Sequence, residues 1–240
     1  MFNYDPKLRW PSSEDLPDSD DTPVDNELQD LIPSLLKSIL AIIWENRMDW
    51  FFGVDMGIYY DPEESAIVPD GFLSLGVERI FDEEELRSSY AIWEEKQVPI
   101  FALEVMSGTY RGEFTTKKEK YAELGVLYYA VYNPRRRKKP RLEVYRLANR
   151  AYEYLPGNLI WMPEIGLGIG REEGTYQGIT REWLYWYNEQ GQRFLTPEEL
   201  VREERQRAQQ EQQLRLEAER RARMLEERLR SLGVDPDTLI

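Results

Sequence analysis

The sequence predicts an α/β domain followed by one long, charged C-terminal helix, and three observations predict it. Apolar residues first recur at steps of three and four, which is the helical period. Short segments rich in β-branched and aromatic residues then alternate with turn residues, as strands do. From residue 196 the chain consists mostly of Glu, Gln, Arg, Leu and Ala, which favour a helix. With 240 residues, 41% of them hydrophobic, the chain can bury one good core.

The first helix is predicted to begin after a polar segment. Residues 1–25 are rich in Pro, Ser and Asp, which favours an acidic lead-in that packs no core. Asn26 is a favoured N-cap residue, and the apolar positions after it keep to one helical face as far as residue 47. Pro33 lies inside this pattern, so we expect it to delay the start of the helix or to kink the first turns.

Strands and a second helix are predicted to follow. Six segments have strand composition: 50–60, 66–75, 99–106, 126–132, 142–147 and 151–155. Between the third and fourth, residues 114–124 form an amphipathic helical pattern that ends at Gly125. Later, Gly166, Gly168 and Gly170 alternate with apolar residues but lack the G-x-x-x-x-G-K-[ST] pattern of a phosphate loop. This favours a bend in an edge strand over a nucleotide site. Residues 175–187 are predicted to add one more strand with aromatic packing.

The last helix is predicted from its ends. Thr196 is placed as its N-cap, Pro197 as its first residue and Gly233 as its stop. A 3/4-spaced seam consists of Leu214, Ala218, Ala222, Leu225, Leu229 and Leu232. This seam predicts a short coiled coil and hence a homo-oligomer; the alternative is an exposed helix held by i,i+4 Glu/Arg pairs. The predicted divisions are therefore 1–25, 26–195, 196–233 and 234–240.

The composition excludes several kinds of active site. The chain has no His and no Cys, which excludes Ser-His-Asp and Cys-His catalysis, Cys/His zinc sites, disulfides and haem held by either residue. Any metal must be held by oxygen atoms, which favours Mg²⁺, Mn²⁺ or Ca²⁺. The remaining classes are hard-cation chemistry, carboxylate acid/base chemistry and no catalysis.

The charge is unevenly distributed. The net charge is −14, yet residues 101–150 hold 12 basic and 5 acidic residues, whereas residues 1–100 hold 7 basic and 23 acidic. The basic segment is where a polyanion is expected to bind. Its first basic cluster is Lys117, Lys118 and Lys120, and its second is Arg135, Arg136, Arg137, Lys138 and Lys139. For the second cluster the alternative is a solvated turn between two strands. We found no apolar run that could span a bilayer and no signal-peptide pattern, so we expect a soluble, cytoplasmic protein without a membrane partner.

Two carboxylates lie in apolar segments. Asp70 follows Pro69 at the edge of one predicted strand, and Glu104 lies inside another, on the face of Ala102 and Met106. An ionised acid in such surroundings is costly unless a cation compensates it. If the two strands are neighbours, both carboxylates can point into one cleft and share a Mg²⁺ ion. The alternatives are a turn acid at Asp70 and an arginine-paired acid at Glu104.

A lysine can complete this pair. Lys117 and Tyr121 are one turn apart on the predicted helix 114–124 and share a face. A lysine there can hold an attacking water and stabilise charge on a phosphate, which is what phosphodiester hydrolysis requires when no histidine exists. The alternative is a solvated helix lysine.

Three motifs in this order resemble a known family. PDG at 69–71, LEVMSGTYRGEF at 103–114 and KKEKYAELGVLYYAVYNP at 117–134 resemble the Uma-type restriction endonuclease family of the PD-(D/E)XK nuclease superfamily. The resemblance covers about residues 25–195. It implies a restriction-endonuclease-like fold, with a mixed central β-sheet flanked by helices. It also implies endonucleolytic hydrolysis of nucleic acid, with DNA as the expected substrate and Mg²⁺, or alternatively Mn²⁺, as the cofactor.

The resemblance also assigns roles to residues. Asp70 and Glu104 would bind the metal with the backbone carbonyl of Val105. Met106 stands where the superfamily usually has lysine, so Lys117 would take the catalytic role, with Lys118 and Lys120 as rivals. Accessory residues near the cleft would be Asp55, Glu113, Glu27 and Tyr121, with Asp30 as an alternative to Glu27. The 135–139 cluster would contact the nucleic-acid backbone without reading sequence.

Two rival functions are compatible with the same sequence. The first is a catalytically silent, nuclease-like adaptor that assembles through its C-terminal helix. The acidic first hundred residues and Met106 favour it, and the set of Asp70, Glu104 and Lys117 opposes it. The second is a carboxylate-only glycoside hydrolase, which requires a sugar-binding groove that no sequence pattern indicates.

Overall fold

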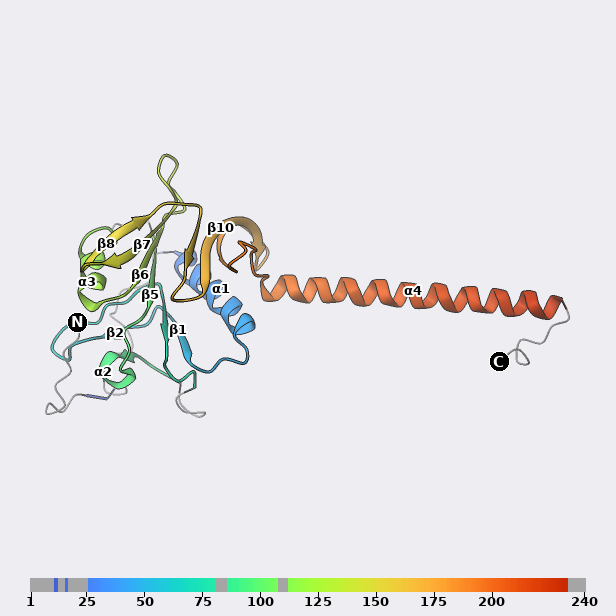
Figure 1. The fold of residues 1–240 in the computed structure, drawn as a ribbon, viewed down its shortest axis with the longest axis horizontal. Helices are drawn as coiled ribbons and strands as arrows, with labels where there is room; N and C mark the ends of the chain where they lie inside the picture. Colours follow the sequence, from blue (N-terminus) through green and yellow to red (C-terminus); the bar gives the residue numbers. More distant parts are fainter. Residues whose placement is uncertain (1–10, 13–15, 17–25, 81–85, 108–111, 233–240) are drawn as a thin grey trace. The chain divides into compact units, whose positions relative to one another are not determined.

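A mixed sheet forms the centre of the fold. The computed structural model describes residues 11–12, 16, 26–80, 86–107 and 112–232. These residues form a six-stranded sheet in the order β1-β3-β5-β6-β7-β8 (Figure 1). The strands are β1 (Trp50–Val54), β3 (Gly71–Leu75), β5 (Phe101–Val105), β6 (Tyr128–Tyr132), β7 (Leu142–Ala148) and β8 (Ala151–Leu155). Only β5 and β6 pair in parallel within it, so the predicted α/β class with a mixed sheet is confirmed.

The first two predicted strands are shorter than the sequence indicated. The segment 50–60 is broken at Asp55, whose φ of 47° turns the chain away from the sheet, and β2 (Ile58–Tyr59) pairs instead with β4 (Tyr90–Ala91). The predicted strand 66–75 begins only at Gly71. The Asp55 N–H bonds the Asp70 carbonyl at 3.2 Å just beyond the β1/β3 ladder, so the two strands part at this level.

Helix α1 (Glu27–Ile43) begins directly after its N-cap residue, Asn26. The Asn26 side chain accepts the N–H of Leu28 at 3.0 Å, so the N-cap prediction is confirmed. The delayed start expected from Pro33 is wrong, because the helix begins six residues before it. The helix also ends at Ile43, earlier than the predicted residue 47.

A second sheet covers α1, and of its strands the predicted strand 175–187 corresponds to the last one. It consists of β9 (Leu159–Met162), β10 (Leu167–Tyr176) and β11 (Ile179–Tyr187) in the antiparallel order β11-β10-β9. The Trp186 indole N–H donates to the Leu36 carbonyl of α1 at 3.0 Å. The edge-strand prediction for the glycine-rich segment is wrong, since β10 is the central strand. A Cβ on Gly170 would lie 2.8 Å from the Tyr187 ring, so glycine here permits close packing on that ring.

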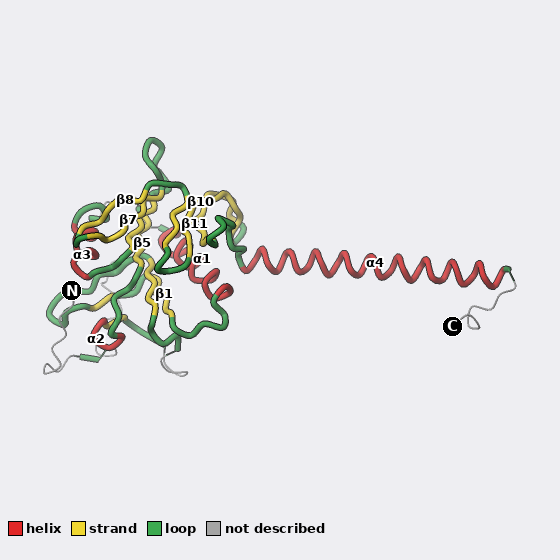
Figure 2. The backbone as a smooth tube through the Cα atoms, in the orientation of Figure 1, coloured by secondary structure: helices red, strands yellow, loops and turns green. Residues whose placement is uncertain are grey.

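The two faces of the central sheet bury different partners. Phe101 and Leu103 face the core that α1 and the second sheet share. Ala102 and Met106 face the core on the side of α3 (Thr116–Leu124), together with Tyr121. Figure 2 shows α1 and α3 on either side of β5. The predicted helix end is confirmed, because Gly125 closes α3 with a φ of 90°. A short helix, α2 (Ile92–Glu95), follows β4.

The chain divides into two compact units, residues 1–194 and 195–240. The second contains α4 (Pro197–Ser231), which begins with a capping box: Thr196 Oγ1 accepts the Glu199 N–H, and the Glu199 carboxylate accepts the Thr196 N–H. Among the described residues of α4, none is buried. Nor is any helix in the described part of the chain long and apolar enough to cross a membrane. The predicted stop at Gly233, the tail 234–240 and most of the lead-in 1–25 lie outside the described residues.

Candidate active site

The strand register places Asp70 beside Glu104. Asp70 directly precedes β3, and its neighbour Gly71 pairs with Leu103 of the antiparallel strand β5. The expectation that the two strands are sheet neighbours is therefore confirmed. Both acids are buried, with 7% of Asp70 and 2% of Glu104 exposed. The sheet thus brings two carboxylates together in a region almost closed to bulk water.

Asp70 is held from two sides. Its Oδ1 accepts a hydrogen bond from Gln29 Nε2 of α1 at 3.1 Å, and its Oδ2 accepts the N–H of Val105. Asn26 Nδ2 lies 3.5 Å from Gln29 Oε1, which turns the Gln29 amino group toward Asp70. A helix cap and a strand amide therefore fix the orientation of this carboxylate. Asp70 is a buried acid bonded across the fold, not an exposed turn acid.

Glu104 is held by α3. Lys117 Nζ donates to its Oε2 at 2.8 Å, and the Tyr121 hydroxyl donates to its Oε1 at 2.8 Å. Lys117 Nζ also donates to the Val68 carbonyl at 3.1 Å. The alternative of an arginine-paired Glu104 is wrong, because the cation is a lysine. The alternative of a solvated Lys117 is wrong as well.

The rival lysines point elsewhere. Lys118 Nζ lies 3.4 Å from the centre of the Tyr145 ring, and Lys120 Nζ lies 4.6 Å from the centre of the Tyr60 ring. Each residue step on a helix rotates the side chain by about 100°, so neighbours of Lys117 cannot share its direction. Of the three lysines, Lys117 is the one that bonds an acid of the site.

Burial dominates the electrostatics of this cluster. Desolvation raises the pKa of Asp70 well above its usual range, and the charge of Glu104 raises it further, against the Val105 N–H and Lys117. Desolvation also raises the pKa of Glu104, although Lys117 and Tyr121 oppose this. Burial lowers the pKa of Lys117, but Glu104 and Asp70 outweigh it and leave the pKa raised. Two carboxyl groups therefore share one ammonium group, and a second cation would reduce the repulsion between them when both are ionised.

The donor set fits a magnesium ion. Each oxygen of the two carboxylates already accepts one hydrogen bond and keeps a second lone pair for a metal. In the described residues no group of three or more acidic side chains gathers as a metal cluster. Mg²⁺ is usually held by one or two carboxylates and otherwise by waters and substrate phosphates, whereas Ca²⁺ takes more protein oxygens. The carbonyl of Val105 as a ligand stays a prediction.

Comparison with known proteins shows the family of the chain. A family model, Uma2, described as "Putative restriction endonuclease", matches residues 21–172. The chain belongs to the Uma2 family. This confirms the resemblance and the restriction-endonuclease-like fold predicted with it. No curated protein matches. A solved structure described as "a putative nuclease belonging to DUF820", from Anabaena variabilis ATCC 29413, is 17% identical, with a TM-score of 0.44, over 59% of this chain and 75% of that one.

The accessory residues of this Uma2 protein differ in their positions. Glu113 is buried in the turn before α3, and its charge adds to the burial that raises the pKa of Glu104. Asp55 is exposed but, through its charge, adds to the burial and Glu104 charge that raise the pKa of Asp70. Glu27 is exposed on α1, and Asp30 bonds Ser34.

Gln29 of α1 bonds Asp70, and this contact was not predicted from the sequence. Its signal was an amide on the same helical face as the buried residues Ile32 and Leu36. Such an amide must find a polar partner, and here the partner lies 41 residues away along the chain.

The basic cluster 135–139 forms the hairpin loop between β6 and β7, so the turn that was its alternative is present. Arg136 pairs with Glu143 of β7, while Arg135, Arg137, Lys138 and Lys139 are exposed. The loop begins just after Tyr132, whose strand partner is Val105. The exposed basic side chains therefore lie in a loop at the same end of the sheet as the two acids.

One hollow lies apart from the acids. It measures about 1680 Å³ and lies between α2, α3 and the β7–β8 hairpin, with Trp93, Lys118 and Tyr152 in its lining. Asp70, Glu104 and Lys117 do not line it. We place the candidate active site at the acids because buried, strongly perturbed carboxylates are expected at catalytic sites, whereas volume alone is not specific.

Proposed function

We propose that this Uma2 protein is an endonuclease that hydrolyses phosphodiester bonds of DNA with Mg²⁺, or Mn²⁺ in its place. The observation that carries the proposal is the buried set of Asp70, Glu104 and Lys117, drawn from neighbouring strands and the following helix. Family membership supports a nuclease. The metal and the DNA substrate belong to the proposal.

Each residue of the set has a role in it. A divalent cation, when bound by the two acids, neutralises charge on the phosphate and makes water more acidic. Gln29 and the Val105 N–H orient the Asp70 carboxylate, and Tyr121 orients that of Glu104. Lys117 uses two of its three N–H donors on Glu104 and Val68, which leaves the third for a phosphate oxygen or the attacking water.

The surroundings favour a polyanionic substrate. The exposed residues Arg135, Arg137, Lys138 and Lys139 lie in the loop that starts at the same end of the sheet as the acids. Charges on a surface attract a phosphate over about 8 Å at physiological salt, even on a chain whose net charge is −14. This local field supports nucleic acid as the substrate class.

Cleavage assays test the proposal directly. Supercoiled, linear and single-stranded DNA are incubated with Mg²⁺ or Mn²⁺ and the wild type, Asp70→Asn or Glu104→Gln, which keep the side-chain shapes. Glu63→Gln is the control, since this exposed acid lies in the same loop as Asp70. We expect nicking by the wild type and the control only. Equal cleavage by all four proteins would place the activity elsewhere.

A non-catalytic assembly protein is the second candidate. It is favoured by Met106 in place of the superfamily lysine and by α4, of whose described residues none is buried. In this case the wild type would cleave no DNA with either metal, while a change in the α4 seam would still alter its oligomeric mass. That pair of results would replace the enzyme proposal.

A further inference from the structure

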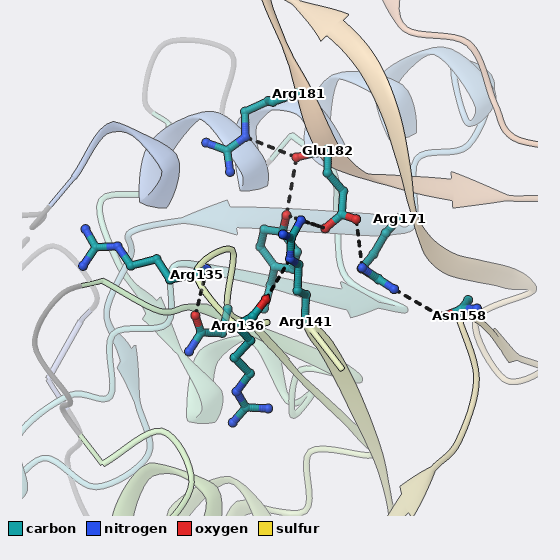
Figure 3. A network of polar contacts seen from close by, with 9 residues as sticks. Arg135, Arg136, Arg141, Asn158, Arg171, Arg181 and Glu182 are labelled. Carbon is teal, nitrogen blue, oxygen red and sulfur yellow. Dashed lines mark hydrogen bonds and ion pairs between the residues drawn. The ribbon is translucent and has the colours of Figure 1, made fainter. Parts of the chain in front are cut away.

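Three arginines lie around Glu182 at the junction of the two sheets, two on its carboxylate and one on its backbone carbonyl. Arg141 Nη1 lies 3.4 Å and Arg171 Nη1 2.8 Å from the Glu182 carboxylate (Figure 3). Arg181 Nε donates to the Glu182 carbonyl at 3.2 Å. The Tyr132 hydroxyl at the end of β6 donates to Glu182 Oε1 at 3.1 Å. We call Arg141, Arg171 and Arg181 the arginine cluster.

The arginine cluster carries more positive charge than its surroundings neutralise. Glu182 supplies one negative charge for three guanidinium groups. Its cross-strand neighbour Glu173 supplies a second, while Glu172 is already paired with Arg193 at 3.0 Å. The side chains of Arg141 and Arg171 are 38% and 20% exposed, and Arg171 also donates to Asn158 Oδ1 at 3.2 Å. The cluster therefore keeps a positive charge within reach of solvent.

This surplus lies at the end of the sheet that holds the candidate active site. Tyr132, which contacts Glu182, pairs with Val105 of β5, and the Val105 N–H bonds Asp70. The Tyr132 ring packs in the core on the α1 side of the sheet, whereas Glu104 faces α3. The arginine cluster and Glu104 therefore lie on opposite faces and approach each other at the end of the strands. The basic hairpin loop lies between them, since Arg141 Nε bonds the Arg136 carbonyl at 3.0 Å. A chain of phosphates that crosses this end of the sheet would meet the acids, the loop and then the cluster.

We propose that Arg141, Arg171 and Arg181 form a second phosphate-binding surface, which grips the DNA backbone beyond the β6–β7 loop, with Glu182 holding the guanidinium groups in position. The inference rests on the proposed DNA substrate. A guanidinium fork binds a phosphate through two parallel N–H···O bonds, which suits arginine to this task. Contacts of this kind position DNA and read no sequence.

A binding titration tests the surface without cleavage. The full-length protein is added to a short fluorescent DNA duplex in EDTA, and the association constant is measured by anisotropy at several NaCl concentrations. Loss of one phosphate contact lowers the slope of log K against log[salt] by about 0.9. We expect this decrease for Arg171→Ala and for Arg141→Ala, and about twice as much for the double variant. Glu182→Gln removes the competing carboxylate and should tighten binding.

A matched pair elsewhere on the sheet serves as the control. Arg146 and Glu164 form an ion pair at 2.6 Å with similar exposure, and Arg146 pairs with Tyr128 at the opposite end of β6. Arg146→Ala and Glu164→Gln change the net charge by the same amounts as the test variants. Because they lie at the other end of the strand, we expect them to leave the slope of log K against log[salt] unchanged. An equal effect of both sets of variants would mean that DNA binding depends on the total charge of the protein, and this would overturn the proposal.

Further variants separate contact from folding. Arg171→Lys keeps the charge, so it should keep most of the salt slope even if the melting temperature falls. If Arg171→Ala and Arg171→Lys lower the slope equally, the arginine acts on the fold and the proposal fails. An unchanged slope in both alanine variants, or no DNA binding by the wild type, also overturns it. Arginine-dependent binding by a protein that cleaves nothing would refute the hydrolysis alone.

Discussion

Asp70 and Glu104 occupy positions that are unfavourable for the metal-free fold. Both are buried, and desolvation raises the pKa of each above its usual range. A raised carboxyl pKa means that the folded state prefers the neutral acid, so ionisation at neutral pH destabilises it. Functional sites commonly retain such costs because the same groups bind the ligand. Under the proposed function, the site would exchange stability for affinity toward a cation.

This exchange predicts that Asp70→Asn stabilises the metal-free protein. At pH 7–8 the asparagine removes a buried charge, and its amide can still bond Gln29 and the Val105 N–H if the Gln29 amide flips. We expect a gain of about 1–2 kcal/mol in the free energy of unfolding, or a few degrees in Tm, measured in EDTA.

The stability gain of Asp70→Asn is expected to increase with pH. The acid is neutral in both states below its ordinary pKa of about 3.9, so the gain is absent there. It grows as pH rises through the interval up to the raised pKa of Asp70, because only the wild type ionises. Added MgCl₂ should raise the Tm of the wild type and not that of Asp70→Asn. A variant less stable than the wild type at pH 8 in EDTA would contradict this account.

At the scale of single residues, the sequence predicted the two acids better than the residues that hydrogen-bond them. Asp70 and Glu104 were visible because a carboxylate in an apolar strand needs a reason, and Lys117 because it shares a face with Tyr121. Gln29 was missed, since a helical pattern gives the face of an amide but not its partner in another element. The catalytic and metal-binding roles of these residues stay predictions.

Among the elements, α3 determines the geometry of the site. It supplies Lys117 and Tyr121, both bonded to Glu104, and ends at Gly125. The φ of Gly125 is 90°, and a Cβ added there would have no atom within 4 Å. The requirement for glycine is therefore a matter of backbone conformation and not of space.

We predict that Gly125→Ala lowers the free energy of unfolding by about 1 kcal/mol through this conformational cost. Gly125→Asn should lose less, because asparagine tolerates left-handed conformations better than alanine. Urea denaturation followed by circular dichroism measures both. If the alanine variant were as stable as the wild type, the C-cap would not limit the stability of the domain.

Prediction of the elements failed where tertiary contacts break a local pattern. The segment 50–60 has continuous strand composition, yet Asp55 turns the chain because its N–H bonds the Asp70 carbonyl. The glycine-rich segment was predicted as a bend in an edge strand, yet it belongs to the central strand β10, where its glycines admit the Tyr187 ring and the Trp161 ring. In contrast, α1, α3 and α4 were found because caps and helical periodicity are local.

On the scale of the whole molecule, charge is segregated along the chain. The net charge of −14 would repel DNA at a distance, whereas the β6–β7 loop and the arginine cluster collect cations at the end of the sheet that holds the acids. The segment sums of the sequence predicted the loop. The arginine cluster escaped because Arg141 and Arg171 come from strands of different sheets, which the sequence does not place together.

The second unit offers the last prediction, that the protein assembles through α4. Leu225 is 58% exposed on the seam, and Leu216 is 48% exposed on the opposite side of the helix, since nine residues correspond to about 180°. Burial of Leu225 against a second copy would remove apolar surface from water. We therefore expect Leu225→Glu to convert an oligomer to a monomer and Leu216→Glu to leave it intact. Analytical ultracentrifugation at several concentrations measures the mass of each. The intrahelical pair Arg215–Glu219 at 3.1 Å supports the opposite outcome, in which an exposed helix is held by its own charges. A wild type that is monomeric at every concentration would establish that alternative.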